Sequence, residues 1–289
     1  MDDNALFHQV GSASSTGARV RATDYCRGPW SLETLHGGPV VGLLAWTTEQ
    51  AAQSVDPHSA FVCSRLTVEM LRAVPLAELD VAATIVKPGR RSMIVDAEIS
   101  HEGTRVARST SQWLSIADTP TIADTPTIAD TPTISSEAPP RPTEISDPRL
   151  HTEFTYPDPG FNCDASELRY VAGSHEDAGP GTTWLRLTSP LIAGQPNSPF
   201  VMAATISDLA AAAGWEPGPN GNNYINPDLT LQLHRNPEGP WLAIDSQAEH
   251  GGNGVALMAA TLYDDHGPVG RVLQSLVETP LQLDAQRTQ

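Results

Sequence analysis

The chain contains two copies of one sequence pattern, and this duplication limits its fold more than any other feature. Residues 66–115 align with residues 229–278 without a gap. The alignment places Thr67 on Thr230, Leu79 on Leu242, Gly89 on Gly252 and Arg72 on Arg235. Identity between the copies is low, but their turn and strand signals coincide. We therefore expect one structural unit twice, packed as a pseudo-twofold pair in the way that two subunits of a homodimer pack.

Each copy predicts antiparallel strands joined by tight turns. Residues 66–72 and 229–235 alternate between apolar and polar side chains, as half-buried strands do. Glycine turns follow at 87–89 and 250–252, and hairpin turns are expected at His101-Glu102-Gly103 and at residues 264–267. The sequence thus favours a largely antiparallel sheet.

One helix is expected upstream of the strands in each copy. The first begins at His36-Gly37-Gly38-Pro39 and runs to about Gln53. The second begins with Ser198 as N-cap and Pro199 at the first helical position, runs to Ala213, and ends at Gly214. The expected unit is one helix followed by several antiparallel strands.

A low-complexity segment separates the copies. Residues 116–133 are three repeats of Ile-Ala-Asp-Thr-Pro-Thr, and a proline-rich stretch follows them. Such a segment buries too little apolar surface to offset its ordering entropy, so residues 116–150 are expected to be an extended, solvated linker. This divides the chain into an N-terminal domain at 1–115, the linker, and a C-terminal domain at 151–289.

Composition excludes several classes of function. The net charge is -17, from 34 acidic and 17 basic residues, which disfavours nucleic acid and anionic membranes as partners. Most of the excess negative charge lies in residues 151–289, so a phosphate-bearing ligand would meet less repulsion on the N-terminal part. No apolar run is long enough for a membrane helix, and the first residues lack a secretion signal, so a cytoplasmic location is expected.

Common catalytic and metal-binding motifs are missing from the sequence. It has no Gly-x-Ser-x-Gly elbow, no phosphate-binding P-loop and no His-Glu-x-x-His pair. Cys26, Cys63 and Cys163 are widely spaced, which indicates neither disulfides nor a zinc site, and they are expected to be small buried residues. No metal or cofactor is predicted.

Asp208 is the residue that stands out chemically. It is the only charged residue between Pro199 and Ala213, on a helix that is apolar nearly all round and should be buried. A buried carboxylate must be hydrogen-bonded or become protonated, so Asp208 is either a structural residue satisfied by its neighbours or a general base. The aligned residue of the first copy is Thr48, which is no acid, and Glu49 beside it is expected to be solvated.

Three segments together resemble the acyl-CoA thioesterase II-like family, particularly its actinobacterial members. They are Pro199 to Trp215, Tyr224 to Arg235, and Gly267 to Ser275. The resemblance covers both copies and excludes the linker. It implies an α+β double hotdog fold, in which each of two antiparallel sheets wraps around a helix and the sheets join as an intrachain pseudo-dimer. Hydrolysis of acyl-CoA to free acid and CoA, within fatty acid metabolism, is the activity it implies.

The resemblance also implies a set of site residues. Asp208 matches the catalytic acid, and Gln274 matches a glutamine that helps hold the attacking water. Asn226 stands where the family has Thr or Ser, so it departs from the pattern. An amide can both donate to and accept from water, but an asparagine before Pro227 is also a common turn former.

Two further groups are candidates for binding the substrate. Family members hold the oxyanion with backbone N–H groups near a helix start, and His36, Gly37 and Gly38 offer such an opening, although a tight turn required by packing would also explain it. Arg90 and Arg91 beside Gly89 are candidates for the CoA phosphates, against the alternative of a solvated turn.

The sequence leaves two other functions open. A hotdog hydratase or dehydratase would share the fold, but it usually combines Asp with His, and no histidine lies on the Asp208 helix. A non-catalytic acyl-CoA-binding module would follow if Asn226 marks a decayed site. The expected partner is acyl-CoA, with further association of pseudo-dimers into a homo-oligomer left open.

Overall fold

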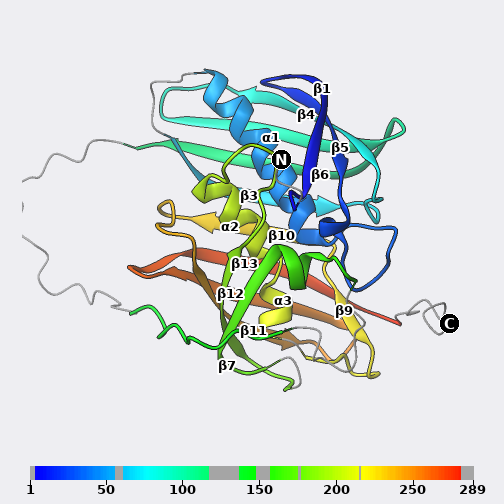
Figure 1. Cartoon of the computed structure of the whole chain (residues 1–289). Helices are drawn as coiled ribbons and strands as arrows, with labels where there is room; N and C mark the ends of the chain where they lie inside the picture. The colour runs from blue at the N-terminus through cyan, green and yellow to red at the C-terminus, as the bar shows by residue number, and fades with distance from the viewer. Residues whose placement is uncertain are drawn as a thin grey trace, which may run out of the picture.

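A computed structural model describes residues 4–55, 61–116, 137–147, 157–174, 177–214 and 216–280. The described residues form one antiparallel sheet with the order β1-β2-β4-β5-β6-β3-β10-β13-β12-β11-β8-β7, to which the short β9 adds at β13 (Figure 1). The N-terminal strands are β1 Phe7–Ser14, β2 Gly17–Ala22, β3 Phe61–Met70, β4 Glu78–Lys87, β5 Ser92–His101 and β6 Thr104–Ser115. The C-terminal strands are β7 Ser166–Ala172, β8 Gly181–Leu187, β9 Asn223–Ile225, β10 Asp228–Leu233, β11 Leu242–His250, β12 Val255–Asp264 and β13 Gly267–Thr279.

The two halves of this sheet are related by a pseudo-twofold axis between β3 and β10. Thr67 and Thr230, which are 163 positions apart, lie directly opposite each other, and their Oγ1 atoms are 3.4 Å apart. Leu66 pairs with Leu231 and Val68 with Leu229, as a twofold through the threonine pair requires. The ungapped alignment of the two copies is confirmed, because β5 and β12, and likewise β6 and β13, begin at equivalent residues.

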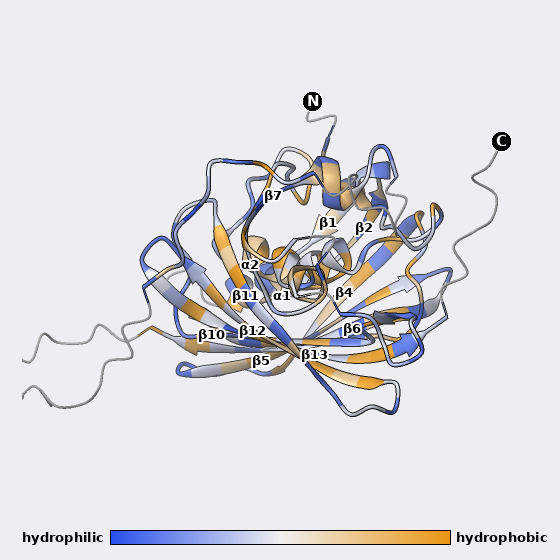
Figure 2. Cartoon of the chain, turned by 90° about the horizontal axis from the view of Figure 1, so that it is seen from below, coloured by the Kyte–Doolittle hydropathy of each residue, from blue (hydrophilic) through white to orange (hydrophobic). Residues whose placement is uncertain are grey.

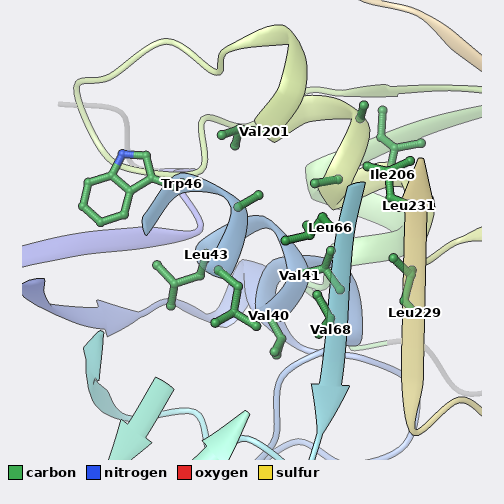
Figure 3. Close-up of a cluster of buried hydrophobic side chains, with 14 of the residues drawn as sticks. Val40, Val41, Leu43, Trp46, Leu66, Val68, Val201, Ile206, Leu229 and Leu231 are labelled. Carbon is green, nitrogen blue, oxygen red and sulfur yellow. The ribbon is translucent and has the colours of Figure 1, made fainter. Parts of the chain in front are cut away.

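The helices lie on the concave side of the curved sheet (Figure 2). They are α1 Gly37–Val55, α2 Pro199–Ser207 and the single turn α3 Ala210–Ala213. Apolar side chains of α1 and α2 pack against the inward residues of β3 and β10, including Leu66, Val68, Leu229 and Leu231 (Figure 3). Burial of this joint core holds the two halves in one body and confirms the double hotdog arrangement.

The second helix begins as predicted but is not continuous. Ser198 caps α2, its Oγ accepting from the backbone N–H of Val201 at 3.1 Å, with Pro199 at the first position. The expectation of one helix to Ala213 is wrong, because α2 ends at Ser207 and α3 begins at Ala210. The Ser207 hydroxyl donates to the carbonyl of Ala204, and the N–H of Leu209 bonds to the carbonyl of Ile206, so the chain tightens at this point.

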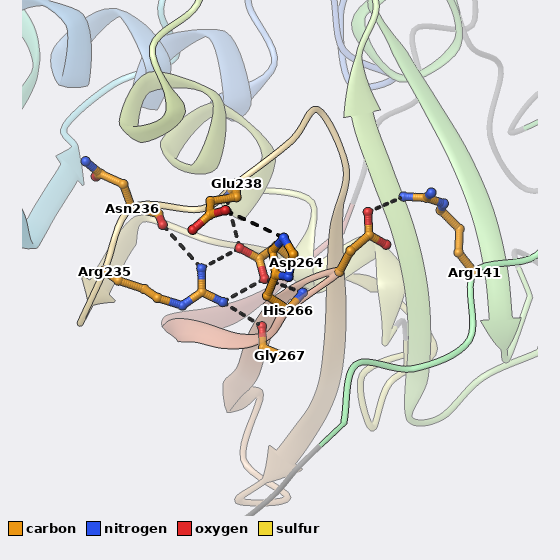
Figure 4. Close-up of polar contacts among 8 residues, drawn as sticks. Arg141, Arg235, Asn236, Glu238, Asp264, His266 and Gly267 are labelled. Atoms are coloured by element: carbon orange, nitrogen blue, oxygen red, sulfur yellow. Dashed lines mark hydrogen bonds and ion pairs between the residues drawn. The ribbon is translucent and has the colours of Figure 1, made fainter.

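The linker prediction is wrong for residues 137–147, which pack against the C-terminal half. The Trp184 indole N–H donates to the carbonyl of Pro139 at 3.1 Å, and the Arg141 guanidinium lies 5.2 Å and 5.3 Å from the ring centroids of Trp184 and Trp241. Arg141 also pairs with Asp265 (Figure 4). Arg141 and the Pro139 carbonyl make specific contacts with the C-terminal half, which a proline-rich composition does not reveal. Most of the repeats, from residue 117 onward, lie outside the described residues.

Two smaller expectations concern the cysteines and membrane helices. Cys26 and Cys63 are buried as expected, and Cys163 is half-buried. Within the ranges that the structure describes, no helix is long and apolar enough to cross a membrane.

Candidate active site

Asp208 lies at the break between α2 and α3, where it faces the N-terminus of α1. Asp208 is buried, with 6% of the residue exposed. The α1 and α2 helices pack closely through glycines, because a β-carbon at Gly38 would lie 2.9 Å from the carbonyl oxygen of Thr205 and one at Gly42 would meet the Thr205 hydroxyl. This close approach brings a carboxylate from the C-terminal half to the positive end of a helix from the N-terminal half, where a negative charge is favoured.

Three residues surround the Asp208 carboxylate. The Asn226 side-chain amide donates to Oδ1 at 2.8 Å, and Nδ1 of His36 lies 3.1 Å from Oδ2. The α-carbon of Gly37 packs directly on the same group, since a β-carbon there would be 2.5 Å from Oδ2 and 2.7 Å from Oδ1. His36, Gly37, Asp208 and Asn226, four of the residues expected from the sequence, therefore meet in one place.

His36 Nδ1 faces two partners of opposite kind. The backbone N–H of Gly38 points at it from 3.0 Å, and the Asp208 carboxylate approaches it from the other side. A bare Nδ1 accepts from Gly38, whereas a protonated Nδ1 donates to Asp208. A proton on the Asp208 carboxyl can likewise donate to bare Nδ1. The arrangement can thus hold a proton between an imidazole and a carboxylate.

The side chain of Gln274 contacts the backbone of Asp208 and not its carboxylate. It lies on β13 among the inward residues that alternate along this strand, which explains why it is fully buried. Its Nε2 donates to the carbonyl oxygen of Asp208 at 3.3 Å, and its Oε1 has no hydrogen-bond partner among the described residues. A buried acceptor of this kind is ordinarily satisfied by a donor such as a water molecule.

A cavity of about 490 Å³ opens beside the carboxylate. Its lining comes from both halves and includes His36, Gly37, Asp208 and Asn226. The rest of the lining is mostly apolar, and it comprises Pro29, Trp30, Thr34, Leu35, Val40, Met70, Arg72, Ala73, Val74, Asn162, Ala211, Ala212, Tyr224, Ile225, Pro227 and Thr279. This volume and this mixture of apolar walls with a few polar groups are typical of small-molecule sites.

The start of α1 leaves one backbone donor beside the cavity. The N–H of His36 bonds to the carbonyl of Cys26, the N–H of Gly38 points at the His36 ring, and Pro39 has no N–H. The first N–H groups of a helix have no acceptor within the helix. The N–H of Gly37, which lines the cavity, is therefore the candidate oxyanion donor among the three expected residues.

Arg90 and Arg91 lie away from this cavity. They are in the turn between β4 and β5, and the carbonyl of Arg91 accepts from the backbone N–H of Ser115, the residue paired with Phe61 at the start of β3. The cavity lies at the other end of β3, at Met70. The structure therefore does not bring these arginines to the other site residues.

Glu49 on α1 makes a contact with α2 that resembles the contact of Asp208 with α1, contrary to the expectation that Glu49 is solvated. Glu49 is 9% exposed rather than solvated, and its Oε1 accepts from the hydroxyl of Ser198 at 2.8 Å, at the start of α2. Each helix thus presents an acid to the first residues of the other. Thr48, which the alignment placed on Asp208, instead bonds to the carbonyl of Ala45. Glu49 is the only charged residue on α1, just as Asp208 is the only charged residue between Pro199 and Ala213.

Glu49 lies in a closed environment. It does not line the cavity, and burial raises the pKa of its carboxyl above the ordinary value, while the Ser198 hydrogen bond opposes part of the rise. Among the described residues, the pair Asp208 and His36 opens on the cavity and the pair Glu49 and Ser198 does not.

Comparison with protein families gives matches in both halves. The N-terminal domain of acyl-CoA thioesterases matches residues 26–114, and the C-terminal domain of acyl-CoA thioesterases matches residues 135–277. No curated protein sequence matches the chain significantly.

Solved structures share the fold at low identity. A putative thioesterase II from Thermobifida fusca is 15% identical, with a TM-score of 0.64 over 96% of this chain and 97% of that one. An acyl-CoA thioesterase II from Mycobacterium marinum is 14% identical, with a TM-score of 0.63 over 93% and 95%. A conserved hot dog protein from Alicyclobacillus acidocaldarius is 16% identical, with a TM-score of 0.66 over 96% and 97%. The two domain matches together span most of the sequence, and the chain thus belongs to the acyl-CoA thioesterases, thioester hydrolases that here have a double hotdog fold.

Proposed function

We propose that this protein hydrolyses acyl-CoA thioesters at the cavity beside Asp208, with Asp208 as the general base. The observation that carries the proposal is the convergence of both halves on one carboxylate: His36 and Gly37 from the first, Asn226 from the second, all lining one cavity. A thioester carbonyl is activated, so a positioned water and one oxyanion donor suffice without a covalent intermediate.

The proposed reaction transfers one proton twice. Asp208 accepts a proton from water as the water oxygen bonds to the thioester carbonyl carbon, and the N–H of Gly37 donates to the developing oxyanion. The carbon–sulfur bond then breaks, and the proton on Asp208 passes to the departing CoA sulfur. Asn226 holds Oδ1 by its 2.8 Å hydrogen bond, so that Oδ2, beside His36, is left for the proton.

Gln274 has a supporting part in this proposal. Its Nε2 contact with the Asp208 carbonyl holds the turn between α2 and α3, and its Oε1, which has no hydrogen-bond partner among the described residues, is a buried acceptor next to this turn. Gln274 does not line the cavity, so we assign it to positioning and expect a smaller loss from Gln274→Ala than from changing Asp208.

Asp208→Asn tests the base directly. The change keeps the side-chain shape and removes the proton acceptor, so thiol release from acyl-CoA should fall by about 10² to 10⁴ while acyl-CoA binding persists. Asp265→Asn is the matched control, because Asp265 is exposed and lies away from the cavity. Unaltered turnover in Asp208→Asn would refute the mechanism.

The His36 and Asp208 contact also suits a hydratase. No histidine lies on α2 or α3, but His36 from the other half of the chain reaches the Asp208 carboxylate. Thiol release and loss of enoyl-CoA absorbance, measured on the same preparation, separate the two activities. Thiol release supports hydrolysis, absorbance loss of enoyl-CoA without thiol release supports hydration, and binding of acyl-CoA with neither signal would indicate a binding module.

The proposed substrate, acyl-CoA, indicates the metabolic role of the protein. Release of free acid and CoA belongs to fatty acid metabolism, and we propose that it takes place in the cytoplasm, where acyl-CoA would be the partner of this acidic chain.

A further inference from the structure

Arg72 and Arg235 occupy the same position in the two halves but have different surroundings. The residue before each arginine donates its backbone N–H to an equivalent carbonyl: Leu71 to Val106 at 3.0 Å, and His234 to Val269 at 3.1 Å. The duplication therefore left one arginine just beyond the end of β3 and one just beyond the end of β10.

Arg235 is neutralised inside its own half. Its guanidinium binds both carboxylate oxygens of the fully buried Asp264, at 2.5 Å and 2.6 Å, and also the carbonyl of Gly267 (Figure 4). Burial opposes ionisation of Asp264, but the hydrogen bonds from Arg235 and from two backbone N–H groups outweigh it and lower the pKa of this carboxyl. Arg235 is therefore a structural cation.

Arg72 lacks this partner. The residue of β5 equivalent to Asp264 is His101, whose Nδ1 contacts the carbonyl of Glu78 instead. The side chain of Arg72 makes no hydrogen bond or ion pair with other described residues, and the residue is exposed. Arg72 nevertheless lines the cavity, where it is the only Arg or Lys among the lining residues.

We propose that Arg72 binds the phosphate groups of the CoA part of the substrate at the mouth of the cavity. This inference rests on the proposed function. The pantetheine arm separates the CoA phosphates from the thioester, so they must lie outside the buried Asp208 and near exposed residues. A guanidinium free of internal partners binds phosphate oxygens through two parallel hydrogen bonds. The negative net charge of the chain makes such a local cation necessary for a polyanionic ligand.

The test compares two substrates in Arg72→Gln. For acyl-CoA, KM should rise about tenfold with kcat nearly unchanged, the effect of losing one charge-assisted contact. For the same acyl group on pantetheine, which has no phosphate, the kinetics should be unchanged. The rise of KM with ionic strength should be smaller in the variant than in the wild type. Arg271→Gln is the control, because Arg271 is exposed and does not line the cavity.

Direct binding keeps the proposal separate from the hydrolysis mechanism. Calorimetry with CoA itself should show about tenfold weaker binding to Arg72→Gln than to the wild type, and this holds even if the wild type hydrolyses no thioester. Equal CoA binding by the two proteins would overturn the proposal. Equal losses for acyl-CoA and acyl-pantetheine would also overturn it, as would a loss confined to acyl chains with a terminal carboxylate.

Discussion

The α-carbon of Gly37 lies against the carboxylate of Asp208, so closely that a β-carbon at residue 37 would be 2.5 Å from Oδ2. Gly37 begins the helix of the N-terminal half, and Asp208 ends a helix of the C-terminal half. Neither half alone contains this contact. It exists because the two helices pack across the pseudo-twofold axis.

Gly37→Ala should therefore reduce activity far more than stability. The added methyl group meets the end of a side chain that can turn away, so the fold survives while the base is displaced. We expect kcat to fall by about 10² or more, since small displacements of a catalytic group are costly. Gly42→Ala is the matched variant: its methyl group meets Thr205 and not Asp208, so Tm should fall while kcat of the folded protein is retained. The opposite pattern in the two variants would contradict this geometry.

Asn226→Ala should lower kcat by about tenfold or more. The change removes the donor to Asp208 Oδ1, and hydrogen bonds to charged groups contribute about 1.5 to 3 kcal/mol. Asn226→Thr should restore much of the lost activity, because a hydroxyl can donate to the same carboxylate. Steady-state kinetics of the two variants decide the point, and wild-type activity in Asn226→Ala would show that the donor is dispensable.

Glu49→Gln should stabilise the protein at neutral and alkaline pH. Burial raises the pKa of Glu49 in the folded state, so its protonated form is favoured there. Its contribution to stability is complete below the unfolded pKa of about 4.3 and is lost as pH rises through the folded pKa. The Tm difference between Glu49→Gln and the wild type should grow from near zero at about pH 4 to several degrees at high pH.

Glu69→Gln should change stability with the opposite pH dependence to Glu49→Gln. The hydrogen bond from Arg108 lowers the pKa of this exposed carboxyl, so its contribution is present above the unfolded pKa and is lost as pH falls. Its effect should be small because the pair is solvated. For Glu49, a Tm difference between Glu49→Gln and the wild type that is constant across pH would show that Glu49 does not titrate in this range.

Residues 116–150 should divide into two parts by their effect on stability. Deleting residues 116–133 should change Tm little, because the repeats offer little apolar surface to bury. Arg141→Ala should destabilise the protein by about 1 kcal/mol, since the guanidinium lies on two tryptophan rings and pairs with Asp265. Chemical denaturation of both variants provides the comparison, with Glu144→Ala as the control, because Glu144 is an exposed residue of the same segment.

The sequence by itself determined the repeating unit and most of the candidate residues. Strand positions follow from alternation and glycine turns, which act over a few residues, and so the ungapped alignment agrees with the strand bounds. Asp208 could be singled out because a lone charge on an apolar helix is visible locally. The same signal at Glu49 was available, but its partner Ser198 lies in the other half of the chain.

Only the tertiary structure decided which residues meet. His36 reaches Asp208, and Arg72 reaches the cavity while Arg235 does not, because helix packing and sheet pairing across the pseudo-twofold axis join residues far apart in sequence. The break of the second helix at Asp208 likewise includes a contact from far along the chain, the hydrogen bond from Gln274 Nε2 to the Asp208 carbonyl. Local patterns fix the elements through short-range hydrogen bonding and periodic burial, whereas the site is created by packing between two copies that have diverged in their polar partners.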